Sequence, residues 1–161
     1  RLLFNTPYGL KMDHKQVASE VINFMKADDT RIYKIFIGTD SEKINSTAAD
    51  FVTAVVAHRV GNGGRYFWRR IELDNLHTLR DRIWQEVLIS LETAKEFIQH
   101  LQGNEVPKFD FEIHIDVGEN GATRTMIQEL VGMVRANNFE ARTKPYSCAA
   151  SNVADRHVKG Y

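Results

Sequence analysis

The chain has 161 residues, a length that suits one domain with a sizeable core. It is 43% hydrophobic and 26% charged, as soluble globular proteins ordinarily are, and no apolar stretch approaches the roughly 18 residues of a membrane helix. The 21 basic and 21 acidic residues cancel, and this balance argues mildly against a nucleic-acid binder.

The number of cysteines and the first residues of the chain indicate the cellular compartment that we expect for the protein. Cys148 is the only cysteine, which excludes an intrachain disulfide and a cysteine-based zinc site. No signal-peptide pattern opens the chain, so we expect a reducing, cytoplasmic location. No repeat, low-complexity tract or linker interrupts the sequence, so we expect a single domain over residues 1–161. The oligomeric state does not follow from the sequence.

The first predicted elements are a helix and a strand. The helix covers about residues 13–26, with Asp13 as its N-cap and Gln16 as the capping-box partner. The apolar run that follows, around residues 32–37, reads as a buried strand that stops at a turn with Asp40.

A hairpin follows. Residues 51–58 form an apolar run, and Gly61-Asn62-Gly63-Gly64 accepts the positive φ angles of a tight turn. The return strand begins at Tyr66 and extends to about Leu73. Three consecutive strands joined by short turns predict an antiparallel meander.

The second half of the chain alternates helices with strands. A long helix over about residues 76–101 carries apolar residues every three or four positions. After it we expect a strand, a helix, a short strand and a last helix, over about residues 109–115, 120–136, 139–144 and 147–158. Within the strand that leads to Asp116, Asp110 and Glu112 are expected at the surface.

These elements predict an α/β fold. The two later strands each follow a helix, so they can lie parallel to the first strand through right-handed crossovers. The result is a mixed five-stranded sheet of order 3-2-1-4-5 flanked by helices, which is the ribonuclease H architecture. Strands one and four are adjacent in it, so Asp40 and Asp116 at their carboxyl ends would be neighbours.

Neighbouring carboxylates suggest a metal. Two acids at adjacent strand tips repel each other, and such pairs are tolerated when a divalent cation lies between them. Glu86 and Asp155, on helices, would each add one more acid. Four oxygen donors make a hard-cation site suited to Mg²⁺ or Mn²⁺. Setting these four acids aside leaves 21 basic against 17 acidic residues.

Helix geometry separates Glu86 from the other acids of the long helix. At roughly 100° per residue, Glu86 lies at the border of the apolar stripe and can reach inward, whereas Glu92 and Glu96 project away. A surface ion pair between Glu86 and Arg82 is the alternative. Asp155 lies among small residues that let its helix approach the sheet, and the alternative there is a solvated aspartate.

Several short segments between about Phe36 and Lys159 occur in an order and spacing that are specific when taken together. They are residues 37–41, 51–56, 79–86, 114–118, 144–145 and 149–159. On these segments the chain resembles the YkuK-type family of bacteria, whose members are predicted ribonuclease H-like nucleases. The resemblance implies the ribonuclease H-like fold, with an acidic tetrad of Asp40, Glu86, Asp116 and Asp155.

The resemblance also implies a mechanism. It is hydrolysis of phosphodiester bonds in RNA, DNA or a hybrid by two ions, Mg²⁺ or Mn²⁺, about 3.5–4 Å apart. Asp40 would bridge the ions, and Asp116 and Glu86 would hold the one on the leaving-group side. Asp155 would hold the ion that activates water.

Other residues near the site carry weaker hypotheses. Ser41, Lys144, Arg156 and Lys159 would contact substrate phosphates. His114 would support the metal ligands, and His157 would assist proton transfer. For Ser41 the alternative is closing the turn, and for His114 it is packing or solvation. The six residues are Ser41, Lys144, Arg156, Lys159, His114 and His157.

Two other functions stay open. One is a noncatalytic ribonuclease H-like module that binds nucleic acid or protein. The other is an actin-like ATPase, because the segment 116–123 resembles a phosphate loop and glycines ahead of a helix suit phosphate binding. Those ATPases close two such domains around the nucleotide, and this chain supplies one.

Overall fold

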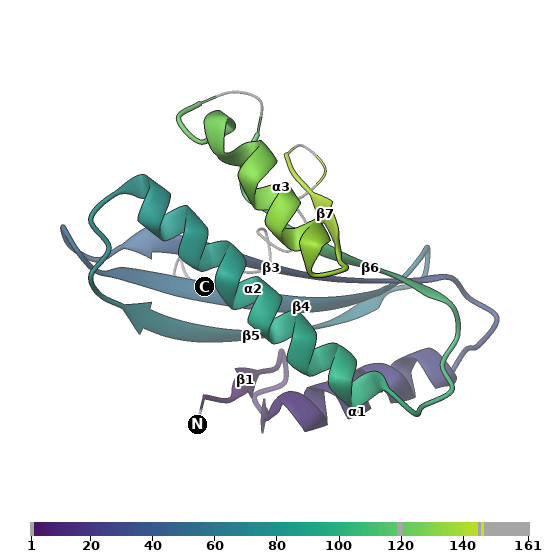
Figure 1. The fold of residues 1–161 in the computed structure, drawn as a ribbon. Coiled ribbons are helices and arrows are strands. Elements are labelled where there is room, and N and C mark those ends of the chain that lie inside the picture. The colour runs from purple at the N-terminus through teal and green to yellow at the C-terminus, as the bar shows by residue number, and fades with distance from the viewer. Residues whose placement is uncertain (1, 119–120, 145, 147–161) are drawn as a thin grey trace.

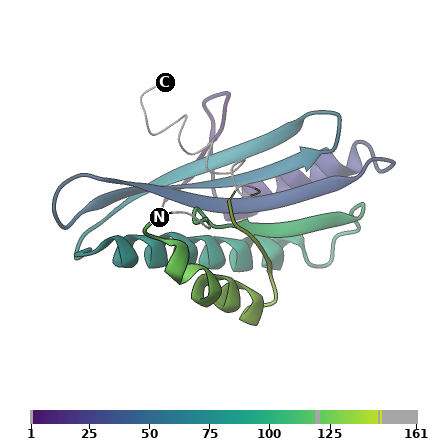
Figure 2. The ribbon, with the colours of Figure 1, turned by 90° about the horizontal axis from the view of Figure 1, so that it is seen from above.

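One mixed sheet runs through the molecule, and α2 (Leu79–Leu101) and α3 (Ile127–Ala136) lie side by side on one of its faces (Figures 1 and 2). The computed structural model describes residues 2–118, 121–144 and 146. The remaining elements are β1 (Phe4–Asn5), β2 (Lys11–Met12), α1 (His14–Lys26), β3 (Tyr33–Lys43), β4 (Ala49–Arg59), β5 (Gly64–Leu73), β6 (Phe109–His114), the short 3-10 helix η1 (Arg124–Met126) and β7 (Glu140–Arg142).

The sheet has seven strands in the order β2-β1-β5-β4-β3-β6-β7. The prediction of a five-stranded sheet is therefore wrong, and the predicted order 3-2-1-4-5 does not describe the whole sheet. The two additional strands are only two residues long and extend the sheet beyond β5. Two residues carry no readable period, so the sequence pattern could not reveal them. Within the larger sheet, β5, β4, β3, β6 and β7 are successive neighbours.

Strand directions place the site. β3, β4 and β5 pair antiparallel, as the predicted meander requires, while β6 lies parallel to β3 and β7 parallel to β6. β3 and β4 are longer than expected, and the ladder between them extends to the pair Lys43–Ala49. The predicted strand end at Asp40 is therefore wrong, because Asp40 lies inside the ladder opposite Val52.

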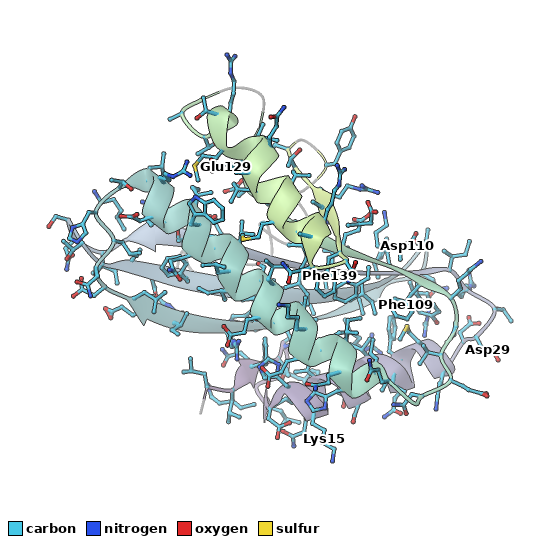
Figure 3. All side chains as sticks on the ribbon, in the orientation of Figure 1. Lys15, Asp29, Phe109, Asp110, Glu129 and Phe139 are labelled. Carbon is cyan, nitrogen blue, oxygen red and sulfur yellow. The ribbon has the colours of Figure 1, made fainter. Side chains whose placement is uncertain are left out.

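The main core lies between the sheet and its helices, where side chains fill the space (Figure 3). Ile35 and Ile37 of β3 are fully buried there with Val87 and Leu91 of α2. Phe36, between the two isoleucines, points to the opposite face and packs with Ala54. This alternation is the period of a strand, and it fixes which β3 side chains can reach α2.

The N-terminal cap of α1 is the predicted one, whereas α2 begins later than predicted. The Asp13 carboxylate accepts a hydrogen bond from the backbone N–H of Gln16, and the Gln16 side-chain oxygen accepts one from the backbone N–H of Asp13, so the predicted capping box is confirmed. α2 begins at Leu79, three residues later than predicted, because Thr78 and Asp81 form a second capping box.

The later elements are shorter than the sequence suggested. η1 and α3 cover residues 124–136 of the predicted helix, and β7 covers Glu140–Arg142 of the predicted strand. Asn138 has a φ of 67°, and this left-handed residue ends the turn between α3 and β7. The predicted last helix, residues 147–158, lies outside the described residues. In the part that the structure describes, no helix has the length and apolar character to cross a membrane.

Candidate active site

Asp40 and Asp116 both lie just beyond the end of the ladder that joins the adjacent parallel strands β3 and β6. The last paired residues of β3 and β6 are Gly38 and His114, and each aspartate follows its paired residue by two positions. The expected proximity of the two acids therefore follows from the register. Asp40 accepts a hydrogen bond from the Ser41 amide at 2.9 Å.

Glu86 joins this end of the sheet from α2. Its side chain is only 4% exposed, whereas Glu92 on the same helix is exposed, as the helix-face argument predicted. By strand alternation Ser41 faces α2, and its hydroxyl donates to Glu86 Oε2 at 2.5 Å. Arg82 Nε donates to the same hydroxyl at 3.2 Å, so Arg82, Ser41 and Glu86 form a chain of hydrogen bonds.

The surroundings of Glu86 disfavour its ionised form. Burial raises the pKa of Glu86 well above its usual range, and the Ser41 hydrogen bond opposes that rise. The negative charges of Asp40 and Asp116 raise the pKa further, and the positive charge of Arg82 lowers it. The three acids therefore interact electrostatically, although they come from β3, α2 and the segment after β6.

Lys144 supplies a cation at this site. Its Nζ lies 2.9 Å from Asp116 Oδ1, and its backbone N–H donates to the Val117 carbonyl at 2.8 Å. Hydrogen bonding to Asp116 and the charge of that acid raise the pKa of Lys144, with smaller contributions from Asp40 and Glu86. Lys144 thus lies among the acids, where we expected only a contact with substrate phosphate.

The donor chemistry fits a hard divalent cation, because three carboxylates lie near enough to interact electrostatically and carboxylate oxygens are the ligands that such ions prefer. Within residues 2–118, 121–144 and 146, no three His, Cys, Asp or Glu side chains stand in position to hold a metal together. Two of the acids instead bind side chains of the protein, Ser41 on Glu86 and Lys144 on Asp116. The fourth predicted ligand, Asp155, lies outside the described residues, as do Arg156, His157 and Lys159.

The two remaining predicted residues have partners within the protein. Ser41 is engaged through both its amide and its hydroxyl. His114 is buried and stacks on Phe36 with ring centroids 4.5 Å apart. Its Nε2 lies 3.1 Å from Oε1 of Glu112. Their roles toward a substrate stay predictions.

Sequence reasoning missed two features of this region. Glu112 is buried, not exposed as expected, because Arg142 of β7 and Lys34 of β3 approach its other carboxylate oxygen at 3.1 and 3.8 Å. Arg82 was expected only as a surface partner of Glu86, and its hydrogen bond to Ser41 was not foreseen. The proximity of Arg82 and Glu86, four residues apart on a helix, was the available signal.

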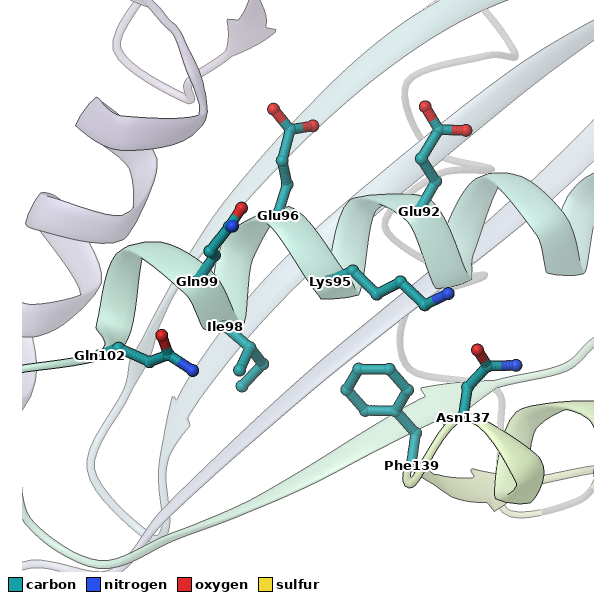
Figure 4. A pocket seen from close by; sticks show the side chains of 8 residues that line it. All are labelled: Glu92, Lys95, Glu96, Ile98, Gln99, Gln102, Asn137 and Phe139. Atoms are coloured by element: carbon teal, nitrogen blue, oxygen red, sulfur yellow. The ribbon is translucent and has the colours of Figure 1, made fainter.

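A separate groove of about 650 Å³ lies between the C-terminal half of α2 and the turn before β7 (Figure 4). Ile98 and Phe139 form its apolar part, and Glu92, Lys95 and Asn137 are among its polar residues. None of the residues that line it belongs to the acid cluster, by which we mean Asp40, Glu86 and Asp116. The candidate chemistry therefore does not lie in this groove.

Comparisons with known proteins agree with the fold and leave the activity open. A family model described as ribonuclease H-like matches residues 16–159. The chain is 31% identical over 168 residues to the uncharacterized protein YkuK of Bacillus subtilis (strain 168), covering 98% of this chain and 97% of that protein. No solved structure gives a significant match.

Proposed function

This chain belongs to the ribonuclease H-like family, and from that premise we propose that it is a metal-dependent nuclease that hydrolyses phosphodiester bonds of nucleic acid. The same matches confirm the resemblance to YkuK that the sequence motifs indicated. The observation that carries the proposal is the buried carboxylate of Glu86, whose pKa is raised by burial and by the negative charges of Asp40 and Asp116.

This arrangement is costly for a protein that does not use it. A buried carboxylate loses its hydration, and two nearby acids add repulsion. Strongly perturbed acids of this kind gather at functional sites, where a ligand of opposite charge offsets their cost. A purely structural role would be served equally by an amide or an apolar side chain at position 86.

The acids would hold the ions. Asp40, Glu86 and Asp116, with Asp155 as the proposed fourth ligand, would bind Mg²⁺ or Mn²⁺. When bound, such ions supply water activation and leaving-group stabilisation in phosphodiester hydrolysis. Ser41 holds the Glu86 carboxylate through its hydroxyl, and Arg82 orients Ser41.

Basic residues would bind the substrate. Lys144 lies beside the acids, and we propose that Lys144, Arg156 and Lys159 contact backbone phosphates. The proposed substrate class is nucleic acid in general, because the site residues that the structure describes carry no feature that distinguishes RNA from DNA. A cytoplasmic location is part of the same proposal.

The test is metal-dependent cleavage by the purified protein on single-stranded RNA and DNA, duplexes and an RNA–DNA hybrid, with Mn²⁺ or Mg²⁺. Asp116→Asn should reduce the rate by several orders of magnitude, because an amide cannot replace the anionic donor. Asp110→Asn, an exposed change on β6, is the matched control and should keep full activity. Full activity in Asp116→Asn would end the nuclease proposal.

One observation favours a second function, a noncatalytic module that binds nucleic acid. Lys144 already neutralises Asp116, and a site whose acids are satisfied by the protein needs no metal to be stable. In that case no variant would cleave, while binding of nucleic acid would survive Asp116→Asn. The ATPase alternative has no observation in its favour among the described residues, and the family match is to the ribonuclease H-like model.

A further inference from the structure

We propose that Lys144 is the built-in counter-cation of the acid cluster, and that a divalent ion binds there by displacing its ammonium group from Asp116. This inference rests on the proposed function, since it concerns the same site. It assigns to Lys144 a role in metal binding that is separate from its proposed contact with substrate.

The backbone holds Lys144 opposite the acids. After β6 and β7 end, the two chain segments continue side by side. The Ile115 N–H donates to the Arg142 carbonyl at 2.8 Å, and the Lys144 N–H donates to the Val117 carbonyl at 2.8 Å. These two bonds flank Asp116. The position of the lysine is therefore set by main-chain contacts on either side of the acid that it meets.

Gly118 makes room for the lysine stem. A Cβ atom at position 118 would lie 3.1 Å from Cβ of Lys144, closer than side-chain carbons ordinarily approach, and 3.7 Å from its Cδ, an ordinary contact. Any other residue would therefore press on the stem of Lys144. The absence of a side chain at 118 is a second feature of the chain that fits this lysine, independent of the hydrogen bonds.

The charge balance favours exchange for a metal. One ammonium offsets only one of the three acids, whereas a divalent ion carries twice that charge. The Lys144 side chain is 55% exposed while that of Asp116 is 24% exposed, so the ammonium can leave toward solvent without opening the core. A lysine side chain carries its positive charge at neutral pH, so Lys144 acts as a cation throughout.

Displacement has a consequence for the substrate. Once a metal takes the carboxylate of Asp116, the tethered ammonium is released next to the acid cluster. A nucleic-acid phosphate that reaches the metals would meet this released cation. Lys144 would thus stabilise the metal-free protein and bind phosphate only in the metal-bound one.

Metal affinity tests the proposal directly. Mn²⁺ binding is measured by calorimetric titration of the full chain without nucleic acid, for the natural protein, Lys144→Met and Lys144→Arg. Because an exposed ion pair is weak, its loss should tighten Mn²⁺ binding only about fivefold in Lys144→Met. Lys144→Arg keeps the charge and should bind close to the natural protein. Lys95→Met, which removes an exposed lysine of α2, should change nothing.

Melting temperatures without metal show whether the Lys144 variants fold. Without metal, Lys144→Met should melt at a lower temperature than the natural protein, and Lys144→Met combined with Asp116→Asn should recover part of that loss. If Lys144→Met does not fold, Lys144→Gln retains a polar stem of similar width and takes its place.

The outcomes separate the two proposals. Equal or weaker Mn²⁺ binding by a folded, uncharged Lys144 variant overturns the counter-cation inference and leaves the nuclease proposal standing. An equal gain in Lys95→Met also overturns it, since the effect would then reflect net charge alone. No Mn²⁺ binding by any variant overturns the proposed function itself, and with it the displacement.

Discussion

Glu86 shows how much one residue determines in this molecule. Its carboxylate is buried on the helix side of the sheet, and it is held by one hydroxyl and repelled by two acids. Such a group favours the folded state when it carries a proton and opposes it when it is ionised. The difference in the pH dependence of stability between the natural protein and Glu86→Gln therefore measures the contribution of this residue.

The first prediction concerns that dependence without metal. The pKa of Glu86 is raised in the folded protein, so the folded state binds the extra proton between the ordinary value of 4.5 and the raised one. The contribution of Glu86 to the free energy of unfolding should be fully present below pH 4.5. It should be lost as the pH rises through the pKa of Glu86 in the folded protein.

Glu86→Gln should remove this loss and gain on the order of 1 kcal/mol over the natural protein at pH 8, because an amide needs no desolvation of a charge. Urea unfolding from pH 5 to 8 in a chelator measures it. Glu92→Gln, on the exposed face of α2, is the control and should follow the natural protein. Parallel curves for Glu86→Gln and the natural protein would contradict the assignment.

The second prediction concerns Ser41. Its hydroxyl lowers the pKa of Glu86, so Ser41→Ala should raise that pKa further. A metal ligand must be ionised, so the acid limb of the rate–pH profile should move to higher pH. At a pH on that limb the rate should fall about tenfold, the scale of a hydrogen bond to a charged group.

Ser41→Thr keeps the hydroxyl and should restore the profile of the natural protein. The measurement is kcat/KM for Mn²⁺-dependent cleavage at a series of pH values. If the acid limb stays in place in Ser41→Ala while the rate falls, Ser41 acts on the substrate and not on Glu86.

At the scale of elements, α2 connects the candidate site to the core. It contributes Glu86 and Arg82 near its start, and its apolar side buries Val87, Leu91 and Phe97 in the core. Its first turn is fixed by Thr78, whose hydroxyl accepts from the Asp81 amide at 3.0 Å. The carboxylate of Asp81 accepts from the Thr78 amide at 3.1 Å in return.

The third prediction is that Thr78→Ala costs about 1 kcal/mol of unfolding free energy, as the loss of an N-cap usually does. For a chain of this length that lowers Tm by about 2–4 °C. Thermal unfolding followed by circular dichroism measures it. Thr123→Ala is a matched control, because the Thr123 side chain makes no capping hydrogen bond at η1, and its Tm should stay unchanged.

At the scale of the whole molecule, the sheet assembles the site from segments far apart in the sequence. Four parts of the chain each supply one charged group: β3 supplies Asp40, α2 supplies Glu86, the segment after β6 supplies Asp116, and the segment after β7 supplies Lys144. A ligand that bridges these segments should therefore stabilise the entire fold.

The fourth prediction is that Mg²⁺ or Mn²⁺ raises Tm. At ten times its Kd an ion that binds only the native state adds about 1.4 kcal/mol, or about 3–6 °C here. Asp40→Asn should abolish most of this shift, while Asp110→Asn should retain it. Differential scanning fluorimetry with and without 10 mM ion, about ten times a Kd near 1 mM, makes the comparison. An equal shift in Asp40→Asn would remove Asp40 from the site.

The sequence by itself determined what depends on local order. The capping box of Asp13 and Gln16, the stripe of α2 and the parallel placement of β3 and β6 follow from short-range chemistry and connection rules. From these, the proximity of Asp40 and Asp116 and the inward position of Glu86 could be predicted.

Only the tertiary structure decided the contacts between distant segments. Ser41 on Glu86, Lys144 on Asp116 and the burial of Glu112 each join residues whose approach depends on the packing and register of the whole sheet. The two-residue strand β1 forms because β5 offers it an edge, and β2 pairs with β1 in turn, so neither strand depends on a period of its own. Side-chain patterns encode which face a residue takes, whereas the partner on that face is chosen by long-range packing.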